Sequence, residues 1–360
     1  MHGYIDKLVE KKAFGADDEL FNNAMLECFE FHVNNCLHYR KFCEKSLPVK
    51  TAGDIPPILV TALKHYALLS VPKEEVVLAL TSSGTGGQKT RLCLNKRSLE
   101  NLQKMAENVH AGMGLVNKRQ EVNYLCFAYD PKYARDLGTT WSDKNSTSFT
   151  KVHEIFYALQ WNGKDFFFDR EGTIEYLKRY AEEDLPLRIL GFPAYIFNAL
   201  EELKKVHGSL NFGKESYVLS GGGWKGKKGA ISKERFRKEL SETLGIPEEN
   251  VRDCYGLAEH GVPYVECSKG NMHIPIYSKV IVRDPLTLKR CKEEKIGLLQ
   301  LMTPYNLTTP YLSVLTTDYG TVRSDCDCGI ETPYIKIKSR AGLKKHVGCA
   351  ISALDHLKSN

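Results

Sequence analysis

A glycine-rich stretch carrying hydroxyl side chains and a lysine is the part of the sequence best suited to chemistry on phosphate. Residues 81–90 read Thr-Ser-Ser-Gly-Thr-Gly-Gly-Gln-Lys-Thr and follow the apolar run 76–80. Glycines let backbone N–H groups turn toward an anion, hydroxyls add donors, and the lysine adds a positive charge. The stretch therefore predicts a phosphate-binding loop made of Ser82, Ser83, Gly84, Thr85, Gly86, Gly87 and Lys89.

This loop matches neither of two common nucleotide-binding motifs. In G-x-x-x-x-G-K-[ST] the lysine directly follows a glycine, whereas Gln88 separates Gly87 from Lys89 here. The pattern G-x-G-x-x-G would need a third glycine at the position of Lys89. A surface turn with solvated hydroxyl groups is the alternative interpretation of the stretch.

Three further segments have residue types suited to a nucleotide. Ser220-Gly221-Gly222-Gly223-Trp224-Lys225 would let a flat ring lie against the backbone, because three consecutive glycines carry no Cβ. Cys254-Tyr255-Gly256-Leu257-Ala258-Glu259-His260-Gly261 combines an aromatic ring with a carboxylate. In Leu315-Thr316-Thr317-Asp318-Tyr319-Gly320, the Asp318 carboxylate can accept two hydroxyl hydrogen bonds at once.

Three thiols and one imidazole offer a set of metal ligands. They are Cys267, His273, Cys326 and Cys328. Three cysteines with one histidine form a common structural zinc set, although the C-x-C spacing is less diagnostic than C-x-x-C. The alternative is a set of unrelated cysteines.

A cysteine near the end of the sequence could act as a nucleophile. Cys349 is flanked by the small residues Gly348 and Ala350, so its thiol is sterically open. His346 and the neighbouring lysines would favour the thiolate, which is the reactive form of cysteine. The alternative is an incidental cysteine in a frayed tail.

The composition is that of a folded globular chain. With 360 residues, 42% hydrophobic and 26% charged, the chain can bury a large core and is longer than one typical domain. The net charge of +6 is mild, and no basic stripe interleaved with aromatics favours nucleic acid. No apolar run approaches the ~18 residues of a membrane span, and no apolar signal region opens the sequence. We therefore expect a cytoplasmic protein.

The eleven cysteines are odd in number and dispersed along the chain. In a long chain without a secretory signal, this usage favours free thiols, metal ligands or nucleophiles over a disulfide framework.

Apolar periodicity predicts an α/β layered fold in which helices flank parallel strands. Helical spacing extends over 15–45, 59–68, 95–113, 172–182 and 194–206. Strand-like runs occupy 76–80, 124–128, 188–191 and 217–220. After residue 250, short β-like runs dominate, at 278–282, 297–302 and 334–338.

These patterns predict an α/β core over 1–250, a smaller β-rich subdomain over 251–339, and a short tail over 340–360. The core would carry the phosphate loop, and the β-rich part would complete the nucleotide site. Aromatic residues that could line a substrate pocket are Trp141, Phe192 and Tyr195, together with Pro193.

The order of these segments resembles the adenylate-forming superfamily, whose members activate carboxylates with ATP. A fifth segment, Lys338-Ser339-Arg340-Ala341-Gly342, stands where that superfamily has a G-R hinge. The resemblance implies that the loop and Lys89 hold the departing phosphates and that Gly221, Gly222 and Gly223 form the adenine-binding turn. It also implies a loop proline that is missing here, and a hydroxyl residue where this sequence has Ala258.

The same resemblance implies roles for the downstream residues. Tyr255 and Gly256 would pack on the adenine, Glu259 would hold Mg²⁺, Asp318 would bind the ribose hydroxyls, and Arg340 would face ribose or phosphate. Enzymes resembling phenylacetate–CoA ligase carry a similar E-C…G-x-H…C-x-C-G pattern, which implies zinc at Cys267, His273, Cys326 and Cys328.

Over nearly its whole length the chain resembles the acyl-protein synthetases of bacterial bioluminescence operons. The likeness is strongest in the phosphate loop, the Gly-Gly-Gly-Trp-Lys segment and Cys349. In that family a C-terminal cysteine accepts the fatty acyl group from acyl-AMP, so Cys349 is the expected acceptor. The superfamily's larger C-terminal domain supplies a catalytic lysine. Lys344, Lys345 and Lys358 are equal candidates to replace it.

The predicted function is therefore ATP- and Mg²⁺-dependent activation of a carboxylic acid, expected to be a fatty acid, followed by thioester formation and delivery to an acyl reductase or another acceptor protein. One alternative is transfer of the acyl group to coenzyme A or another small acceptor. Another is a non-catalytic protein that binds a nucleotide or carboxylate, and a nucleic-acid binder is the least favoured.

Overall fold

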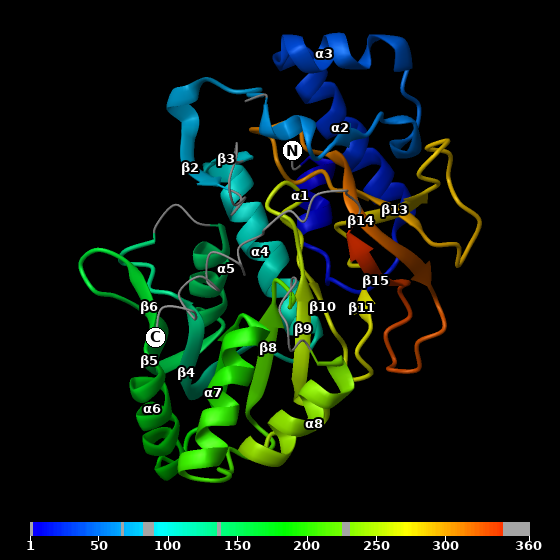
Figure 1. Ribbon diagram of the computed structural model, residues 1–360. Helices are drawn as coiled ribbons and strands as arrows, with labels where there is room; N and C mark the ends of the chain where they lie inside the picture. Colours follow the sequence, from blue (N-terminus) through cyan, green and yellow to red (C-terminus); the bar gives the residue numbers. More distant parts are fainter. Residues whose placement is uncertain (1–2, 66–67, 82–89, 135–137, 225–230, 341–360) are drawn as a thin grey trace.

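The computed structural model describes residues 3–65, 68–81, 90–134, 138–224 and 231–340, without the side chains of 138–140, 143 and 340. Figure 1 shows the arrangement of its elements. The helices are α1 (Tyr4–Val9), α2 (Asp18–Asn35), α3 (Leu37–Cys43), α4 (Lys96–Gly112), α5 (Gly138–Thr147), α6 (Arg170–Glu182), α7 (Pro193–Val206) and α8 (Lys233–Leu244).

A seven-stranded sheet forms the centre of the α/β part. Its strand order is β10 (Tyr264–Val265), β9 (Val251–Tyr255), β8 (Tyr217–Gly221), β7 (Leu187–Gly191), β4 (Asn117–Tyr129), β5 (Thr150–Trp161) and β6 (Phe166–Phe168). The strands from β9 to β5 are parallel, and β10 and β6 are antiparallel strands at the two edges. Because parallel strands all end at one edge, Gly191, Gly221 and Tyr255 finish at the same side of the sheet.

Helices cover both faces of this sheet, as Figure 1 shows. Alternate residues of β4 point to opposite faces. Val122 and Tyr124 join a core with α1, α2 and α4, whereas Leu125 and Phe127 join a core with α6, α7 and α8. This layering confirms the predicted α/β class with flanking helices.

A second, antiparallel sheet is built mainly from the residues after 270. Its order is β11 (Met272–His273), β15 (Tyr334–Arg340), β14 (Ser313–Arg323), β13 (Gly297–Met302) and β12 (Lys279–Arg283). The short strand β1 (Ile58–Leu59) joins it by pairing in parallel with β14. The strands β9 and β10 lie in the central sheet although they also follow residue 250.

A separate hairpin flanks the predicted phosphate loop. Strands β2 (Val76–Thr81) and β3 (Arg91–Asn95) pair antiparallel, with Thr81 opposite Arg91. The residues between them, 82–89, lie outside the described part of the chain. Asn95, the last residue of β3, caps α4, because its side chain accepts a hydrogen bond from the Ser98 N–H at 2.9 Å.

Most predicted elements are confirmed, and two need correction. The helix expected over 15–45 is divided at Cys36, whose backbone is extended, so α2 and α3 are separate. The helix expected over 59–68 is wrong, because β1 ends at Leu59 and, among the described residues of this stretch, only a 3₁₀ turn, Ala62–Lys64, follows. The Val60 N–H donates to the Leu315 carbonyl, so pairing with β14 replaces helical hydrogen bonds here.

A buried irregular segment, 303–312, joins the second sheet to the N-terminal helices. His32 of α2 is fully buried against it: its Nε2 donates to the Asn306 carbonyl at 2.8 Å, and its Nδ1 accepts from the Ser70 hydroxyl at 2.7 Å. Burial lowers the pKa of His32 to about 4, so the ring is neutral at physiological pH. Within the described residues, no helix is both long and apolar enough to cross a bilayer.

Candidate active site and metal centre

Two residues predicted to bind the nucleotide lie in direct contact. Tyr255 ends β9 and Asp318 lies in β14, and the Tyr255 hydroxyl donates a hydrogen bond of 2.9 Å to Asp318 Oδ2. Asp318 is buried, and its register partner in β15 is Arg340. The two sheets therefore meet where the parallel strands end, and the meeting point brings together an aromatic ring and a carboxylate.

The predicted adenine-binding turn begins beside this pair. Gly221 lies opposite Cys254 in the β8–β9 register, next to Tyr255. Gly222 has a φ of +78°, and a Cβ there would lie 3.2 Å from the Phe192 ring, so the turn requires glycine. The following Trp224 packs edge-on against Phe197 of α7 and Phe236 of α8, each at 5.7 Å between ring centroids.

Glu259, the predicted Mg²⁺ ligand, is buried in the turn that follows Tyr255. Burial, and after it the negative charge of Glu259, raises the pKa of Tyr311. The Tyr311 hydroxyl donates a hydrogen bond to the carbonyl of Arg91, the first residue of β3. The Glu259 charge therefore acts on a tyrosine that contacts the start of β3.

Glu259 offers a buried carboxylate, which is a type of ligand that Mg²⁺ takes in proteins. Within the described residues, no hydrogen bond or ion pair to its carboxylate is found. A buried carboxylate is costly unless a cation or donors compensate its charge. The neighbouring imidazole supplies no charge, because burial lowers the pKa of His260 to about 3.

A cluster of charged side chains connects helix α8 to strand β9, which ends at Tyr255. Glu266 is buried and accepts hydrogen bonds from Lys233 at 2.9 Å and from Arg237 at 2.6 Å, both on α8. Lys233 also pairs with Asp253 of β9 at 2.8 Å. Burial opposes the charged form of Lys233, but these two carboxylates outweigh it and raise its pKa. The cluster ties α8 to β9 two residues before Tyr255.

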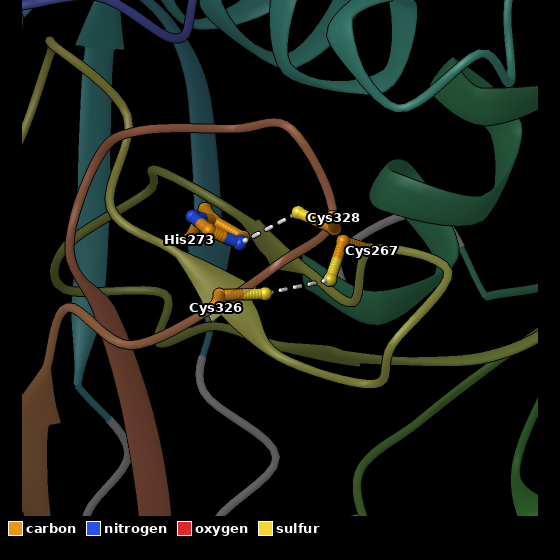
Figure 2. Close-up of side chains that lie close together, drawn as sticks. All are labelled: Cys267, His273, Cys326 and Cys328. Atoms are coloured by element: carbon orange, nitrogen blue, oxygen red, sulfur yellow. Dashed lines mark hydrogen bonds between the residues drawn. The ribbon is translucent and has the colours of Figure 1, made fainter.

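The four predicted metal ligands converge, as Figure 2 shows. Their ligand atoms all lie within 4.8 Å of one another; they are Cys267, His273, Cys326 and Cys328. Cys267 Sγ lies 3.8 Å from Cys326 Sγ, and His273 Nε2 lies 3.2 Å from Cys328 Sγ. Tetrahedral zinc with Zn–S bonds near 2.3 Å separates two sulfurs by about 3.8 Å, so the donor set fits zinc.

Neighbouring groups orient these ligands as a metal would require. His273 Nδ1 donates to the Thr332 carbonyl at 2.7 Å, which leaves the Nε2 lone pair facing the thiols. The Asn271 amide donates to Cys326 Sγ at 3.1 Å, which stabilises negative charge on sulfur. The Cys/His cluster joins β11 to the loop before β15, in the β-rich part of the chain.

Several predicted residues lie outside the described part of the chain. These are the loop residues Ser82, Ser83, Gly84, Thr85, Gly86, Gly87 and Lys89, and the tail residues Lys344, Lys345, His346, Cys349 and Lys358. For Arg340 only the backbone is described, at the end of β15. The aromatic pocket candidates are core residues: Phe192 and Tyr195 belong to the core under α7, and Trp141 packs against the other core.

Sequence reasoning assigned no role to His260 or to the charged groups on α8. Histidine beside the predicted Mg²⁺ ligand was a usable signal, because a buried imidazole needs fixed hydrogen-bond partners. The ion pairs of Lys233 and Arg237 with Glu266 could not be predicted from the sequence, because they depend on how α8 packs on the sheet.

The fold is shared with solved ligases. The structure matches 2-hydroxyisobutyryl-CoA ligase bound to 2-HIB-AMP and CoA in the thioesterification state, with a TM-score of 0.69, 17% identity, and coverage of 90% of this chain and 68% of that one. An open conformation of that ligase gives a TM-score of 0.67 at 16% identity, covering 90% of this chain and 74% of that one.

Curated relatives span almost the whole chain. The "Long-chain-fatty-acid--luciferin-component ligase" of Aliivibrio fischeri is 24% identical over 360 residues, covering 97% of this chain and 91% of the relative. The protein of the same name from Vibrio harveyi is 25% identical over 343 residues, covering 93% and 87%. Residues 11–358 match the family described as "Acyl-protein synthetase, LuxE".

The fold is that of adenylate-forming ligases. Within that class, the chain belongs to the LuxE acyl-protein synthetase family. The protein is therefore a ligase, and the predicted resemblance is confirmed.

Proposed function

We propose that the protein activates a long-chain fatty acid with ATP as an acyl adenylate and then passes the acyl group to Cys349 as a thioester. The observation that carries the proposal is the contact between Tyr255 and Asp318 beside the glycine turn, in a chain of the acyl-protein synthetase family. The names of two curated relatives support a long-chain fatty acid as substrate.

In the first half-reaction, a carboxylate oxygen of the acid attacks the α-phosphorus of ATP, the bond to the β-phosphate oxygen breaks, and pyrophosphate leaves. Tyr255 and the Gly221–Gly223 turn hold the adenine, and Asp318 accepts hydrogen bonds from the ribose hydroxyls. Ser82–Lys89 holds the departing phosphates. The residues thus act by positioning and by neutralising charge.

In the second half-reaction, the Cys349 thiolate attacks the acyl carbonyl, a carbon–sulfur bond forms, and AMP leaves. The covalent intermediate divides one difficult transfer into two easier steps. An acyl reductase is the proposed partner that takes the acyl group from the thioester. We also propose a cytoplasmic location. The proposed parts of the chain are an acyl-activating core over 1–250, a β-rich part over 251–339 that completes the nucleotide site, and a tail over 340–360 that carries the acyl acceptor.

Two metals complete the proposal. Glu259 would hold Mg²⁺, which supplies neutralisation of phosphate charge when it is bound. Cys267, His273, Cys326 and Cys328 would hold a structural Zn²⁺ that fixes the β-rich part beside the nucleotide site. The distances between the ligand atoms and the His273–Thr332 hydrogen bond support this second metal.

An exchange experiment tests the proposal. Full-length protein is incubated with Mg²⁺, ATP, labelled pyrophosphate and single acids of increasing chain length. The proposal expects label in ATP only when an acid is present, and the fastest exchange with a long-chain fatty acid. Failure of every acid to drive exchange would contradict it and favour a non-catalytic nucleotide-binding protein.

Adding coenzyme A distinguishes transfer of the acyl group to Cys349 from its transfer to coenzyme A. The proposal expects label from a radioactive fatty acid to remain on the protein when coenzyme A is added. If coenzyme A instead removes the label as free acyl-CoA at the rate of exchange, the protein is an acyl-CoA ligase.

A further inference from the structure

The turn that carries Glu259 has a tightly fixed backbone. The Leu257 carbonyl accepts hydrogen bonds from the N–H groups of His260, at 3.0 Å, and of Gly261, at 2.8 Å. Gly261 has a φ of +77°, and a Cβ there would lie 2.2 Å from the Tyr305 hydroxyl oxygen. The turn therefore has one allowed conformation, and its position depends on what holds it to the neighbouring strands.

The side chain of His260 holds this turn to two other segments. It is fully buried, and its Nε2 lies 2.9 Å from the Tyr264 hydroxyl of β10 and 3.2 Å from the Ser278 hydroxyl, just before β12. The two hydroxyls are themselves 2.5 Å apart. The Nε2 atom and the two hydroxyls thus pair with one another, which makes this contact costly to break. Among the described residues, His260 Nδ1 has no hydrogen-bond partner, so Nε2 makes all of the ring's hydrogen-bonding contacts.

The same contact leads to the predicted nucleotide-binding pair. The rings of His260 and Tyr264 are near-parallel, with centroids 5.7 Å apart, and the Tyr264 and Tyr255 rings are 6.0 Å apart. Tyr264 and Tyr255 are also register partners in β10 and β9. Tyr255 in turn donates to Asp318. A continuous set of contacts therefore runs from the turn to the residue proposed to bind ribose.

We infer that His260 is a positioning residue for nucleotide activation: through its Nε2 contact with Tyr264 and Ser278, it fixes the Glu259 carboxylate relative to Tyr255. His260 touches neither substrate nor cation and acts through its two neighbours. The inference rests on the proposed function, because it takes Glu259 as the Mg²⁺ ligand and Tyr255 as an adenine contact.

The substitutions His260→Gln and His260→Asn distinguish loss of the Nε2 hydrogen bonds from loss of the imidazole ring. Glutamine places its terminal amide near the position of Nε2, whereas asparagine is too short to reach it. We expect His260→Asn to weaken binding of Mg²⁺·ATP at least tenfold in titration calorimetry of the full chain. His260→Gln should stay within about threefold of the wild type. A ring needed only for packing would give the two variants equal affinities.

The matched control is a second buried histidine. His110 of α4 is also buried, and its Nδ1 donates to the Ala106 carbonyl within the same helix. We expect His110→Asn to lower the melting temperature without changing the affinity for Mg²⁺·ATP. ATP binding in EDTA is the second readout, and His260→Asn should lose less affinity there than with Mg²⁺.

Wild-type affinity in His260→Asn would overturn the inference, and so would an equal loss in His260→Gln. If His260→Asn does not fold, Tyr264→Phe and Ser278→Ala each remove one partner hydroxyl. Each should weaken Mg²⁺·ATP binding about threefold, and unchanged affinity in both overturns the inference. Wild-type protein that binds Mg²⁺·ATP but shows no acid-dependent exchange contradicts the proposed function alone. Absence of any Mg²⁺·ATP binding contradicts both.

Discussion

The Tyr255 hydroxyl and the Asp318 carboxylate are 63 residues apart in the sequence, yet a 2.9 Å hydrogen bond joins them. The bond connects the end of β9 in the central sheet to β14 in the second sheet. A nucleotide bound here would contact both sheets at once, so its affinity should report on how the sheets meet.

Substitutions in this pair should affect ATP and spare the fatty acid. We expect Tyr255→Phe to raise the KM for ATP about 3- to 10-fold, because it keeps the ring and removes one hydrogen bond to a charged group. Asp318→Ala should raise it more, by roughly 30- to 100-fold, since both ribose contacts are lost. Acid-dependent pyrophosphate exchange measures both. An equal rise in the KM for the fatty acid would contradict the assignment.

The metal centre should bind one zinc ion per chain. We expect Cys328→Ser to lose the zinc, measured by atomic emission, and to lower the melting temperature by roughly 5–10 °C, because metal binding contributes directly to folding. The control is Cys291→Ser, which alters a half-buried thiol outside the cluster. Equal zinc content in Cys328→Ser and wild type would refute the centre.

The stability of the fold should fall in mild acid because of His32. Its pKa in the folded chain is about 4, below the ordinary 6.5, so the unfolded chain binds the proton more readily. The stability from this group is complete above pH 6.5 and is lost as the pH falls toward 4. We expect His32→Gln, measured by urea unfolding, to reduce the slope near pH 5 by up to about 1.4 kcal/mol per pH unit. Identical slopes would count against this assignment.

Gly191, at the end of β7, should not tolerate a side chain. Its φ is +124°, and a Cβ there would lie 2.3 Å from the Phe127 carbonyl oxygen. We expect Gly191→Ala to cost about 2–3 kcal/mol of unfolding free energy. Gly163→Ala is the matched control, because Gly163 has a φ of +98° with open space around it, and it should cost only about 1 kcal/mol. Equal costs would show that the close approach to Phe127 is unimportant.

Local signals in the sequence were sufficient for much of the fold. Apolar spacing alone predicted a helix over 95–113, and α4 occupies almost the same residues. The alternation of strand-like runs with helices predicted parallel strands, and β4, β7 and β8 are parallel. The helix expected over 59–68 failed because pairing of Ile58 and Leu59 with β14 overrode local propensity.

For the site, the residue types were predictable and their contacts were not. Cys267, His273 and the two cysteines of the C-x-C pair were chosen by chemistry, and the structure brings them together. The Tyr255–Asp318 bond and the role of Glu266 depend on the meeting of two sheets and on the packing of α8. No spacing within one segment encodes such long-range contacts.

One labelling experiment tests the central claim most directly. Full-length protein is incubated with Mg²⁺, ATP and a radioactive long-chain fatty acid, then denatured and treated with hydroxylamine. We predict ATP-dependent label on the wild-type chain that hydroxylamine releases, and no label on Cys349→Ser, which keeps acid-dependent pyrophosphate exchange. Label that persists on Cys349→Ser would contradict the acyl-cysteine assignment. Wild-type protein with neither label nor exchange would contradict the whole account.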